Sequence, residues 1–335
     1  MSGSPWRWAL LPAWAIFRPI VAARNLAYDL GIAPSTALPV PVLSVGNLAV
    51  GGTGKTPLVD WMVRRLRGLG RRPAVLSRGY GGVAGVNEEA ALVDAPVVCD
   101  PSRVRGGRRA LAEGADCLVL DDGFQHRRLR RDCDIVLIDA TRPWGSAGNL
   151  PAVIPLGLLR EGRGSLRRAD LLVVSRSDQV EPGILAALER DLARFGKPVV
   201  RLVHRPDTLT PLLGDIGEPP QVLAGQSVML ASGLGNPAGF ERTARDLGWN
   251  VIGHHRFPDH HRYNAAEARA LVSEARALHA VLVVTAKDAV KLREFAPTAR
   301  VLSVRADFTG EGLAVVDALI QRALGGAAAA DRPRR

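Results

Sequence analysis

The sequence predicts an α/β fold in which short buried strands alternate with crossover helices. Two observations predict it: short apolar, often β-branched runs recur along the chain, and several of them alternate with segments of helical periodicity. Strands that alternate with helices form parallel sheets, and continuous apolar strands are typical of sheets covered on both faces. The expected strands are residues 42–45, 74–77, 117–120, 135–138, 171–174, 199–203, 228–231, 281–285 and 301–304, and the expected helices are residues 56–69, 184–195, 238–247 and 265–278.

The length and composition indicate a globular protein with a basic surface. The 335 residues allow one large domain or two ordinary ones. With 47% hydrophobic and 23% charged residues, the chain is typical of folded rather than disordered proteins. The net charge of +11 attracts nucleic acid, anionic lipid or phosphorylated small molecules, and the charge alone does not choose among them. Three cysteines without CxxC spacing argue against a disulfide framework or a zinc site and favour a reducing compartment.

The N-terminus differs in character from the rest of the chain. Residues 6–17 are nearly all apolar, which is too short for a bilayer span of about 20 residues. Three interpretations compete: a signal peptide with a cleavage site near residues 21–23, an ordinary core helix, or a helix in the membrane interface. Trp6, Trp8 and Trp14 suit an interface, with nearby arginines facing the headgroups. We therefore predict a membrane-interfacial helix over residues 1–30.

The remaining chain divides into two expected lobes. A stretch rich in Pro and Gly, from about residue 205 to residue 226, is expected to be a loop at the boundary between them. We assign residues 31–210 to a first lobe, residues 211–324 to a second, smaller α/β lobe, and residues 325–335 to a disordered tail.

The strongest motif lies between the first predicted strand and the helix that follows it. Its glycines let backbone N–H groups approach a phosphate, and the start of the helix adds a favourable dipole. Lys55 is then expected to reach the β- and γ-phosphates of ATP, and the Thr56 hydroxyl to bind Mg²⁺. Ala49 stands where the strict P-loop pattern has its first glycine. The predicted fold is thus P-loop NTPase-like, with ATP contacts from Gly51, Gly52, Thr53, Gly54, Lys55 and Thr56.

A pair of carboxylates ends another predicted strand. Asp121 and Asp122 directly follow residues 117–120, and ligands of parallel α/β sheets bind at this edge. A P-loop enzyme uses an Asp in this position to hold Mg²⁺. A simple turn or a helix cap is the alternative, which the nearby Gln125 and His126 make less attractive. We therefore predict Thr56, Asp121 and Asp122 as the magnesium site.

Five segments together resemble the tetraacyldisaccharide 4′-kinase family. These are the glycine-rich segment 46–57, Leu76-Ser-Arg-Gly-Tyr-Gly-Gly, Asp121-Asp-Gly-Phe-Gln-His, Phe257-Pro-Asp-His-His-Arg-Tyr and Thr285-Ala-Lys-Asp-Ala-Val-Lys. The resemblance covers roughly residues 5–305 and implies two α/β lobes with the active site between them. It also implies transfer of the ATP γ-phosphate to the 4′-hydroxyl of tetraacyldisaccharide 1-phosphate, giving lipid IVA, at the cytoplasmic face of the bacterial inner membrane. The N-terminal helix would then engage the membrane and the acyl chains.

The resemblance also implies roles for individual residues. The general base of the family is an Asp in a Gly-Asp-Glu-Pro segment, and the nearest match in this chain is Asn87-Glu-Glu-Ala. Glu88 would thus be the base, with Asp94 as the alternative, and His260 would support it. The substrate residues implied are Asn47, Tyr80, Gly81, Glu89, Arg103, Gln125, His126 and Arg160. Arg103 and Arg160 are expected to bind a phosphate bidentately.

Two other functions compete with this one. A P-loop kinase of another sugar or of a soluble substrate would need no lipid-facing helix. A nucleotide-dependent nucleic-acid-binding protein would suit the basic charge, but the sequence carries no helix-turn-helix, zinc-finger or RNA-module signature. We expect no nucleic-acid ligand and no obligatory protein partner.

Overall fold

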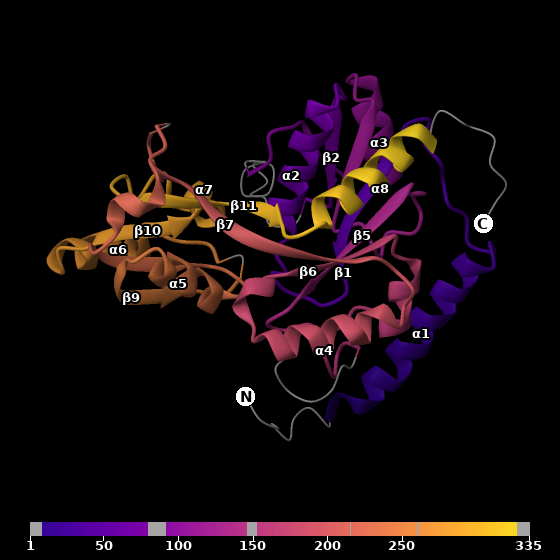
Figure 1. The fold of residues 1–335 in the computed structure, drawn as a ribbon, viewed down its shortest axis with the longest axis horizontal. Helices are drawn as coiled ribbons and strands as arrows, with labels where there is room; N and C mark the ends of the chain where they lie inside the picture. Colours follow the sequence, from indigo (N-terminus) through magenta and orange to yellow (C-terminus); the bar gives the residue numbers. More distant parts are fainter. Residues whose placement is uncertain (1–8, 80–91, 146–152, 215, 260, 327–335) are drawn as a thin grey trace. The chain divides into compact units, whose positions relative to one another are not determined.

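The computed structural model describes residues 9–79, 92–145, 153–214, 216–259 and 261–326 (Figure 1). Its helices are α1 (Leu11–Asp29), α2 (Lys55–Gly68), α3 (Arg103–Ala112), α4 (Pro182–Ala193), α5 (Pro237–Asp246), α6 (Ala265–Ala277), α7 (Ala286–Leu292) and α8 (Gly312–Gly326). Its strands are β1 (Val42–Asn47), β2 (Pro73–Ser77), β3 (Val97–Cys99), β4 (Cys117–Asp121), β5 (Cys133–Asp139), β6 (Leu171–Ser175), β7 (Val199–Pro211), β8 (Ser227–Ser232), β9 (Asn250–Arg256), β10 (Val281–Thr285) and β11 (Arg300–Phe308).

The described chain forms two units, each built on parallel strands. The first unit carries the strand order β3-β2-β4-β1-β5-β6-β7, and the second carries β7-β11-β10-β8-β9. Strand β7 leaves the first unit after Val203 and β11 returns to it at Asp307. Pairs such as β1 with β4 and β8 with β10 are parallel, which confirms the predicted α/β class. Residues 307–326 group with the first unit, whereas the sequence assigned residues 211–324 to the second lobe.

Helices cover both faces of the first unit. One apolar cluster joins β5 and β6 to α4, through residues such as Val136, Leu172 and Leu188. A second cluster joins β2 and β4 to α3, through residues such as Leu118 and Ala110. Figure 1 shows α8 and α4 on opposite sides of strands β1, β5 and β6. Because both faces are covered, β1, β4, β5 and β6 are buried along their whole length, as their continuous apolar runs predict.

The second unit is a smaller α/β layer. Helix α6 packs on one set of β8 and β10 side chains, which includes Met229 and Val284. Helix α5 packs on the alternate set, which includes Leu230 and Val283. Since successive side chains of a strand point to opposite faces, α5 and α6 cover opposite faces of this unit.

Helix α1 lies on the first unit with most of its apolar side chains exposed. None of its residues is buried, which excludes an ordinary core helix. Ile16 is 63% exposed and Ile20 is 59% exposed, whereas Phe17 packs against the cluster under α4. The interfacial prediction also named Trp6 and Trp8, which lie outside the described residues. Among the helices that the structure describes, none has the length and apolarity needed to cross a bilayer.

The structure corrects several sequence-based boundaries. The predicted loop over residues 205–226 is wrong for its first part, because β7 continues as a strand to Pro211. Strands β3 and β9 were not predicted. Both lie at the ends of the strand order, and β9 is only partly buried, so neither requires a continuous apolar run. Helices α3, α7 and α8 were also not predicted.

Candidate active site

The loop between β1 and α2 has the backbone of a phosphate-binding loop. Gly54, the residue before α2, has φ of 87°, and Gly51 has φ of 115°. Residues with a Cβ rarely adopt these values, so both turns favour glycine. Lys55 and Thr56 are the first two residues of α2, where backbone N–H groups remain without intrahelical partners. The loop therefore offers N–H donors and a helix dipole to an anion.

Side chains from two strand ends fix the shape of this loop. Asn47, the last residue of β1, donates from Nδ2 to the Thr53 hydroxyl at 3.0 Å and to the Ala49 carbonyl at 2.7 Å. From the end of β6, the Ser175 hydroxyl donates to the Thr53 carbonyl at 2.8 Å, and Arg176 donates to the Gly52 carbonyl at 3.0 Å. Side chains therefore engage the carbonyls of Ala49, Gly52 and Thr53 and stabilise this conformation of the loop.

The carboxylates at the end of β4 lie beside this loop. Asp122 forms an ion pair with Lys55, with Nζ and Oδ1 3.5 Å apart. Arg160 donates to Oδ2 of the same carboxylate at 2.5 Å. Asp122 has φ of 56°, a left-handed conformation that non-glycine residues seldom adopt. The backbone after Asp122 passes so close to β1 that a Cβ on Gly46 would lie only 2.6 Å from the Cβ of Phe124. This close approach brings the segment 121–126 against the phosphate-binding loop.

The two cations keep Asp122 ionised. Burial acts to raise the pKa of this carboxyl, but the positive charges of Lys55 and Arg160, with their hydrogen bonds, outweigh burial and hold the pKa below its usual range. Lys55, Arg160 and Asp122 therefore form one charged cluster at the start of α2.

The residues predicted for Mg²⁺ fit that ion. Asp121 and Asp122 supply carboxylate oxygens and Thr56 a hydroxyl oxygen, which are the ligands Mg²⁺ prefers. Oδ1 of Asp122 is buried, and among the described residues it faces only the Lys55 ammonium, 3.5 Å away. The described part of the chain holds no group of three or more His, Cys, Asp or Glu able to bind a metal. Mg²⁺ in nucleotide sites needs only one or two carboxylates beside phosphates and waters, so this set is sufficient.

Gln125 and His126 extend the site toward α1. Gln125 donates from Nε2 to the Asn47 carbonyl at 3.0 Å, and its Oε1 accepts from Arg160 at 3.3 Å. His126 lies among arginines, and its Nε2 is buried without a hydrogen bond to a described residue. Burial, followed by the charges of Arg103 and Arg131, lowers the pKa of His126 to about 4. His126 is therefore a neutral imidazole at pH 7.

Arg103 supports the backbone at the end of β4. This first residue of α3 is 4% exposed and donates to the carbonyls of Asp100 at 2.9 Å and Asp121 at 3.4 Å. Burial lowers the pKa of Arg103, while the charges of Asp121 and Asp122 act in the opposite direction. Its observed contacts are with backbone carbonyls, whereas the sequence suggested a phosphate ligand.

Only one of the remaining predicted residues, Asp94, lies in the described part of the chain. Tyr80, Gly81, Glu88, Glu89 and His260 lie outside the described residues. Asp94, the alternative base, pairs with Arg67 at 2.5 Å. Arg67 is twelve residues beyond Lys55 on α2, about 18 Å away at 1.5 Å per residue. That separation argues against Asp94 as the base.

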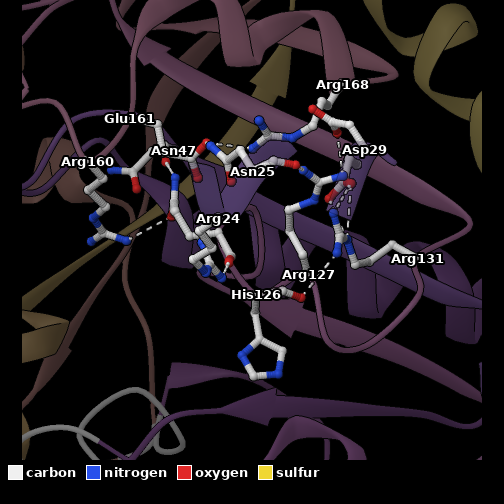
Figure 2. A network of polar contacts seen from close by, with 12 residues as sticks. Arg24, Asn25, Asp29, Asn47, His126, Arg127, Arg131, Arg160, Glu161 and Arg168 are labelled. Atoms are coloured by element: carbon white, nitrogen blue, oxygen red, sulfur yellow. Dashed lines mark hydrogen bonds and ion pairs between the residues drawn. The ribbon is translucent and has the colours of Figure 1, made fainter. Parts of the chain in front are cut away.

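Several site residues were missed by sequence reasoning. Ser175 and Arg176 follow the predicted strand 171–174, and their place at the carboxyl end of a parallel strand was the signal for them. No sequence pattern predicts a role for Asn25 or Glu161, because a single Asn in a helix and an acidic residue after an Arg are both common. Their contact is made only by the fold: Nδ2 of Asn25 donates to Glu161 at 2.8 Å (Figure 2).

Comparison with known proteins identifies the family. The sequence matches the family described as Tetraacyldisaccharide-1-P 4'-kinase over residues 6–323. The chain belongs to the tetraacyldisaccharide 4′-kinase family. A relative named tetraacyldisaccharide 4′-kinase, from Anaeromyxobacter sp. (strain K), is 41% identical, and the alignment covers 100% of this chain and 93% of the relative. Another, from Syntrophus aciditrophicus, is 38% identical over 84% of each chain.

A solved structure of the same family agrees with the fold. The crystal structure of LpxK from Aquifex aeolicus in complex with ATP has a TM-score of 0.73 and 29% sequence identity, and the match covers 95% of this chain and 99% of that one. The activity of the tetraacyldisaccharide 4′-kinase family is ATP-dependent phosphorylation of the 4′-hydroxyl of tetraacyldisaccharide 1-phosphate, in lipid A biosynthesis.

Proposed function

We propose that this tetraacyldisaccharide 4′-kinase transfers the γ-phosphate of ATP to its lipid acceptor at the loop between β1 and α2. The observation that carries the proposal is the cluster of Lys55, Asp122 and Arg160 beside that loop. Phosphoryl transfer asks a protein mainly for positioning and for neutralisation of charge on the phosphate oxygens. A pre-shaped loop of N–H donors with two cations beside it supplies both.

Each residue has one task in this proposal. Lys55 and the N–H groups of residues 51–56 hold the phosphates, and the dipole of α2 adds to their attraction. Thr56, Asp121 and Asp122 would hold Mg²⁺, which would neutralise phosphate charge when bound. Arg160 keeps the Asp122 carboxylate ionised and oriented, as its 2.5 Å contact allows.

The acceptor hydroxyl requires a proton acceptor. We assign this role to Glu88, with His260 orienting the carboxylate and sharing its proton. Tyr80, Gly81, Glu89, Gln125 and His126 are assigned to the sugar and its phosphate, and Arg103 holds the Asp121 carbonyl. Asn47, which the sequence predicted to bind the substrate, is 0% exposed and holds the phosphate-binding loop instead. A neutral His126 can accept a hydrogen bond from a sugar hydroxyl, since one ring nitrogen carries no proton.

The lipid acceptor explains the exposed face of α1. Ile16 and Ile20 are apolar and more than half exposed, and Arg18 lies between them in sequence. An apolar helix face beside cationic side chains is typical of helices that lie in the membrane interface. We place the enzyme peripherally on the cytoplasmic face of the bacterial inner membrane, where ATP is available.

An acceptor screen separates this function from its rivals. The purified enzyme is given ATP, Mg²⁺ and either tetraacyldisaccharide 1-phosphate in mixed micelles or soluble sugars. Phosphorylation of the lipid alone supports the proposal, and equal transfer to a soluble sugar would favour the soluble-substrate kinase. Tight DNA binding that weakens steeply with salt would favour the nucleic-acid-binding alternative.

A further inference from the structure

Glu161 is a buried carboxylate for which the proposed reaction has no task. The residue is 1% exposed. One oxygen, Oε2, accepts hydrogen bonds from Nδ2 of Asn25 at 2.8 Å and from Nη2 of Arg168 at 2.7 Å (Figure 2). A buried charge is costly unless it is paired, so these partners hold Glu161 in place and are held by it. The three residues come from α1, from the loop before residue 163, and from the 3-10 helix Arg163–Arg168.

The first route from Glu161 to the site runs along the chain. Arg160, its neighbour, donates its backbone N–H to the Leu48 carbonyl at 2.9 Å, and the Val50 N–H donates to the Leu158 carbonyl at 2.7 Å. These bonds attach residues 158–161 to the backbone that leads into the phosphate-binding loop. The Arg160 side chain reaches Asp122 from here, while the Glu161 side chain binds α1. Fixing Glu161 therefore fixes the backbone from which Arg160 extends.

The second route runs through Arg168. Its guanidinium carbon lies 4.7 Å from the centre of the Phe124 ring, a cation–π contact. Phe124 is fully buried and stands two residues after Asp122. The Glu161 carboxylate thus orients the guanidinium that covers the segment bearing Asp122.

Helix α1 is attached to that same segment by further polar contacts. Arg24 donates to the Gln125 carbonyl at 2.8 Å, and Arg127 donates to the Asp29 carboxylate at 2.7 Å. Figure 2 shows Arg24, Asn25 and Asp29 of α1 meeting residues of the 121–131 and 160–168 segments. One side of α1 is therefore part of the support of the active site, and this side is separate from its exposed apolar residues.

We propose that Glu161 is a positioning residue. By binding Asn25 it holds α1 against residues 158–161, and so keeps the Arg160 side chain in place on the Asp122 carboxylate. The inference rests on the proposed function, since it gives Asp122 a role in phosphoryl transfer. Gly52 and Thr53 of the phosphate-binding loop are held by contacts that Glu161 does not make, those of Asn47, Ser175 and Arg176. Loss of the Glu161 contacts is therefore expected to lower kcat and to leave the KM for ATP nearly unchanged.

An exchange of the two side-chain types tests the contact. Asn25→Asp sets two carboxylates against each other, and Glu161→Gln removes the charge that pairs with Arg168. Each single variant is expected to lose about tenfold or more in kcat, since a small misplacement caused by a distant mutation can cost about 10²-fold. The double variant restores one carboxylate and one amide between positions 25 and 161, while Arg168 still faces an amide, so its kcat is expected to exceed that of Asn25→Asp and to stay below wild type.

A matched control separates positioning from general destabilisation. Asp317 on α8 accepts two hydrogen bonds of 2.7 Å from Arg65, so Asp317→Asn also weakens a carboxylate–arginine pair of the first unit. This control is expected to lower the thermal midpoint while leaving kcat unchanged. Single Asn25 and Glu161 variants with unchanged kcat, or a double variant no better than the worse single one, would overturn the proposal. An ATP KM that rises in step with the loss of kcat would overturn it as well.

Hydrogen–deuterium exchange gives a readout that does not depend on the acceptor. In the full chain, Asn25→Asp is expected to speed exchange of the amides of residues 122–127, and Asp317→Asn to leave them unchanged. Equal protection in Asn25→Asp and wild type would contradict the positioning role of Glu161 even if the enzyme used another acceptor. If the wild-type enzyme transfers no phosphate to the lipid while the amides of residues 122–127 exchange as expected in the variants, the proposed function is contradicted and the positioning role of Glu161 is not.

Discussion

Arg160 and Asp122 form a 2.5 Å hydrogen-bonded ion pair, although 38 residues separate them in the chain. Asp122 also faces Lys55 at 3.5 Å, so one carboxylate lies between two cations at the start of α2. The arrangement joins three parts of the first unit: the end of β4, the phosphate-binding loop and the segment before residue 163. The charge state of this carboxylate is the feature on which metal binding in the proposed mechanism depends.

Replacement of Arg160 is expected to move the acid limb of the pH–rate profile. The Lys55 and Arg160 charges lower the pKa of Asp122 against the raising effect of its burial. Without Arg160 the folded-state pKa rises, so the carboxylate is protonated at higher pH. In Arg160→Ala the acid limb of kcat should shift upward, with a smaller shift in Arg160→Lys, which keeps the charge. Arg109→Ala, in an exposed pair with Glu113, is the matched control. An unmoved acid limb in Arg160→Ala would refute this charge coupling.

His126 is expected to make stability depend on pH. Its folded-state pKa of about 4 lies below the ordinary value of 6.5. Between these values the unfolded chain binds more protons, so stability falls as pH falls from 6.5 to 4, and this group contributes no further loss below about 4. Urea unfolding of His126→Gln should show a flatter pH dependence than wild type in that window. Parallel curves for the two proteins would exclude the burial effect.

The exposed apolar residues of α1 are expected to bind lipid. Ile16→Ser and Ile20→Ser each remove an exposed apolar side chain from the helix. Each should weaken sedimentation with anionic vesicles roughly three- to tenfold, since apolar burial drives interfacial binding. Ile184→Ser removes a side chain on α4 that is 58% exposed, and it should bind vesicles like wild type. If all three variants bind alike, α1 is not the membrane contact.

Asp288 is expected to be the main polar support of the second unit. It is fully buried and accepts hydrogen bonds from the Gly233 N–H, the Tyr263 hydroxyl and the Thr285 hydroxyl. Asp288→Ala leaves these donors without an acceptor and should cost about 3 kcal/mol or more, whereas Tyr263→Phe removes one bond and should cost about 1 kcal/mol. Denaturant midpoints measure both. Equal costs would show that the donors find other acceptors when Asp288 is removed.

Much of the fold follows from patterns local in the sequence. Buried strands such as β5 and β6 must be apolar throughout because helices cover both faces, and that requirement is visible as an uninterrupted run. Strands β3 and β9 lie at the ends of the strand order, where one edge has no neighbour in the described sheet, and Gly253 and His254 are tolerated in β9. Because β3 and β9 need not be apolar throughout, they lack the continuous apolar run by which the other strands were predicted.

The site was predictable where the chemistry restricts the residue type. The glycines, Lys55, Thr56 and the Asp pair are set by what phosphate and Mg²⁺ require. Arg176 and Glu161 act through contacts across long sequence separations, with the Gly52 carbonyl and with Asn25, and no local pattern records such contacts. Asp94 was an acceptable base by type alone, and its pairing with Arg67 argues against that role.

Single-turnover transfer of label from γ-labelled ATP to tetraacyldisaccharide 1-phosphate, in mixed micelles with Mg²⁺, tests whether Lys55 and Glu88 carry the phosphoryl transfer. Wild type, Lys55→Ala and Glu88→Ala are compared, and the position of the new phosphate is determined by NMR. General-base help is typically worth about 10²- to 10⁴-fold, and the electrostatic clamp at least as much. We predict a 4′-phosphorylated product from wild type, a large loss in Glu88→Ala and a larger one in Lys55→Ala. Wild-type-like transfer by Lys55→Ala, or no transfer by wild type with ATP bound, would contradict the account.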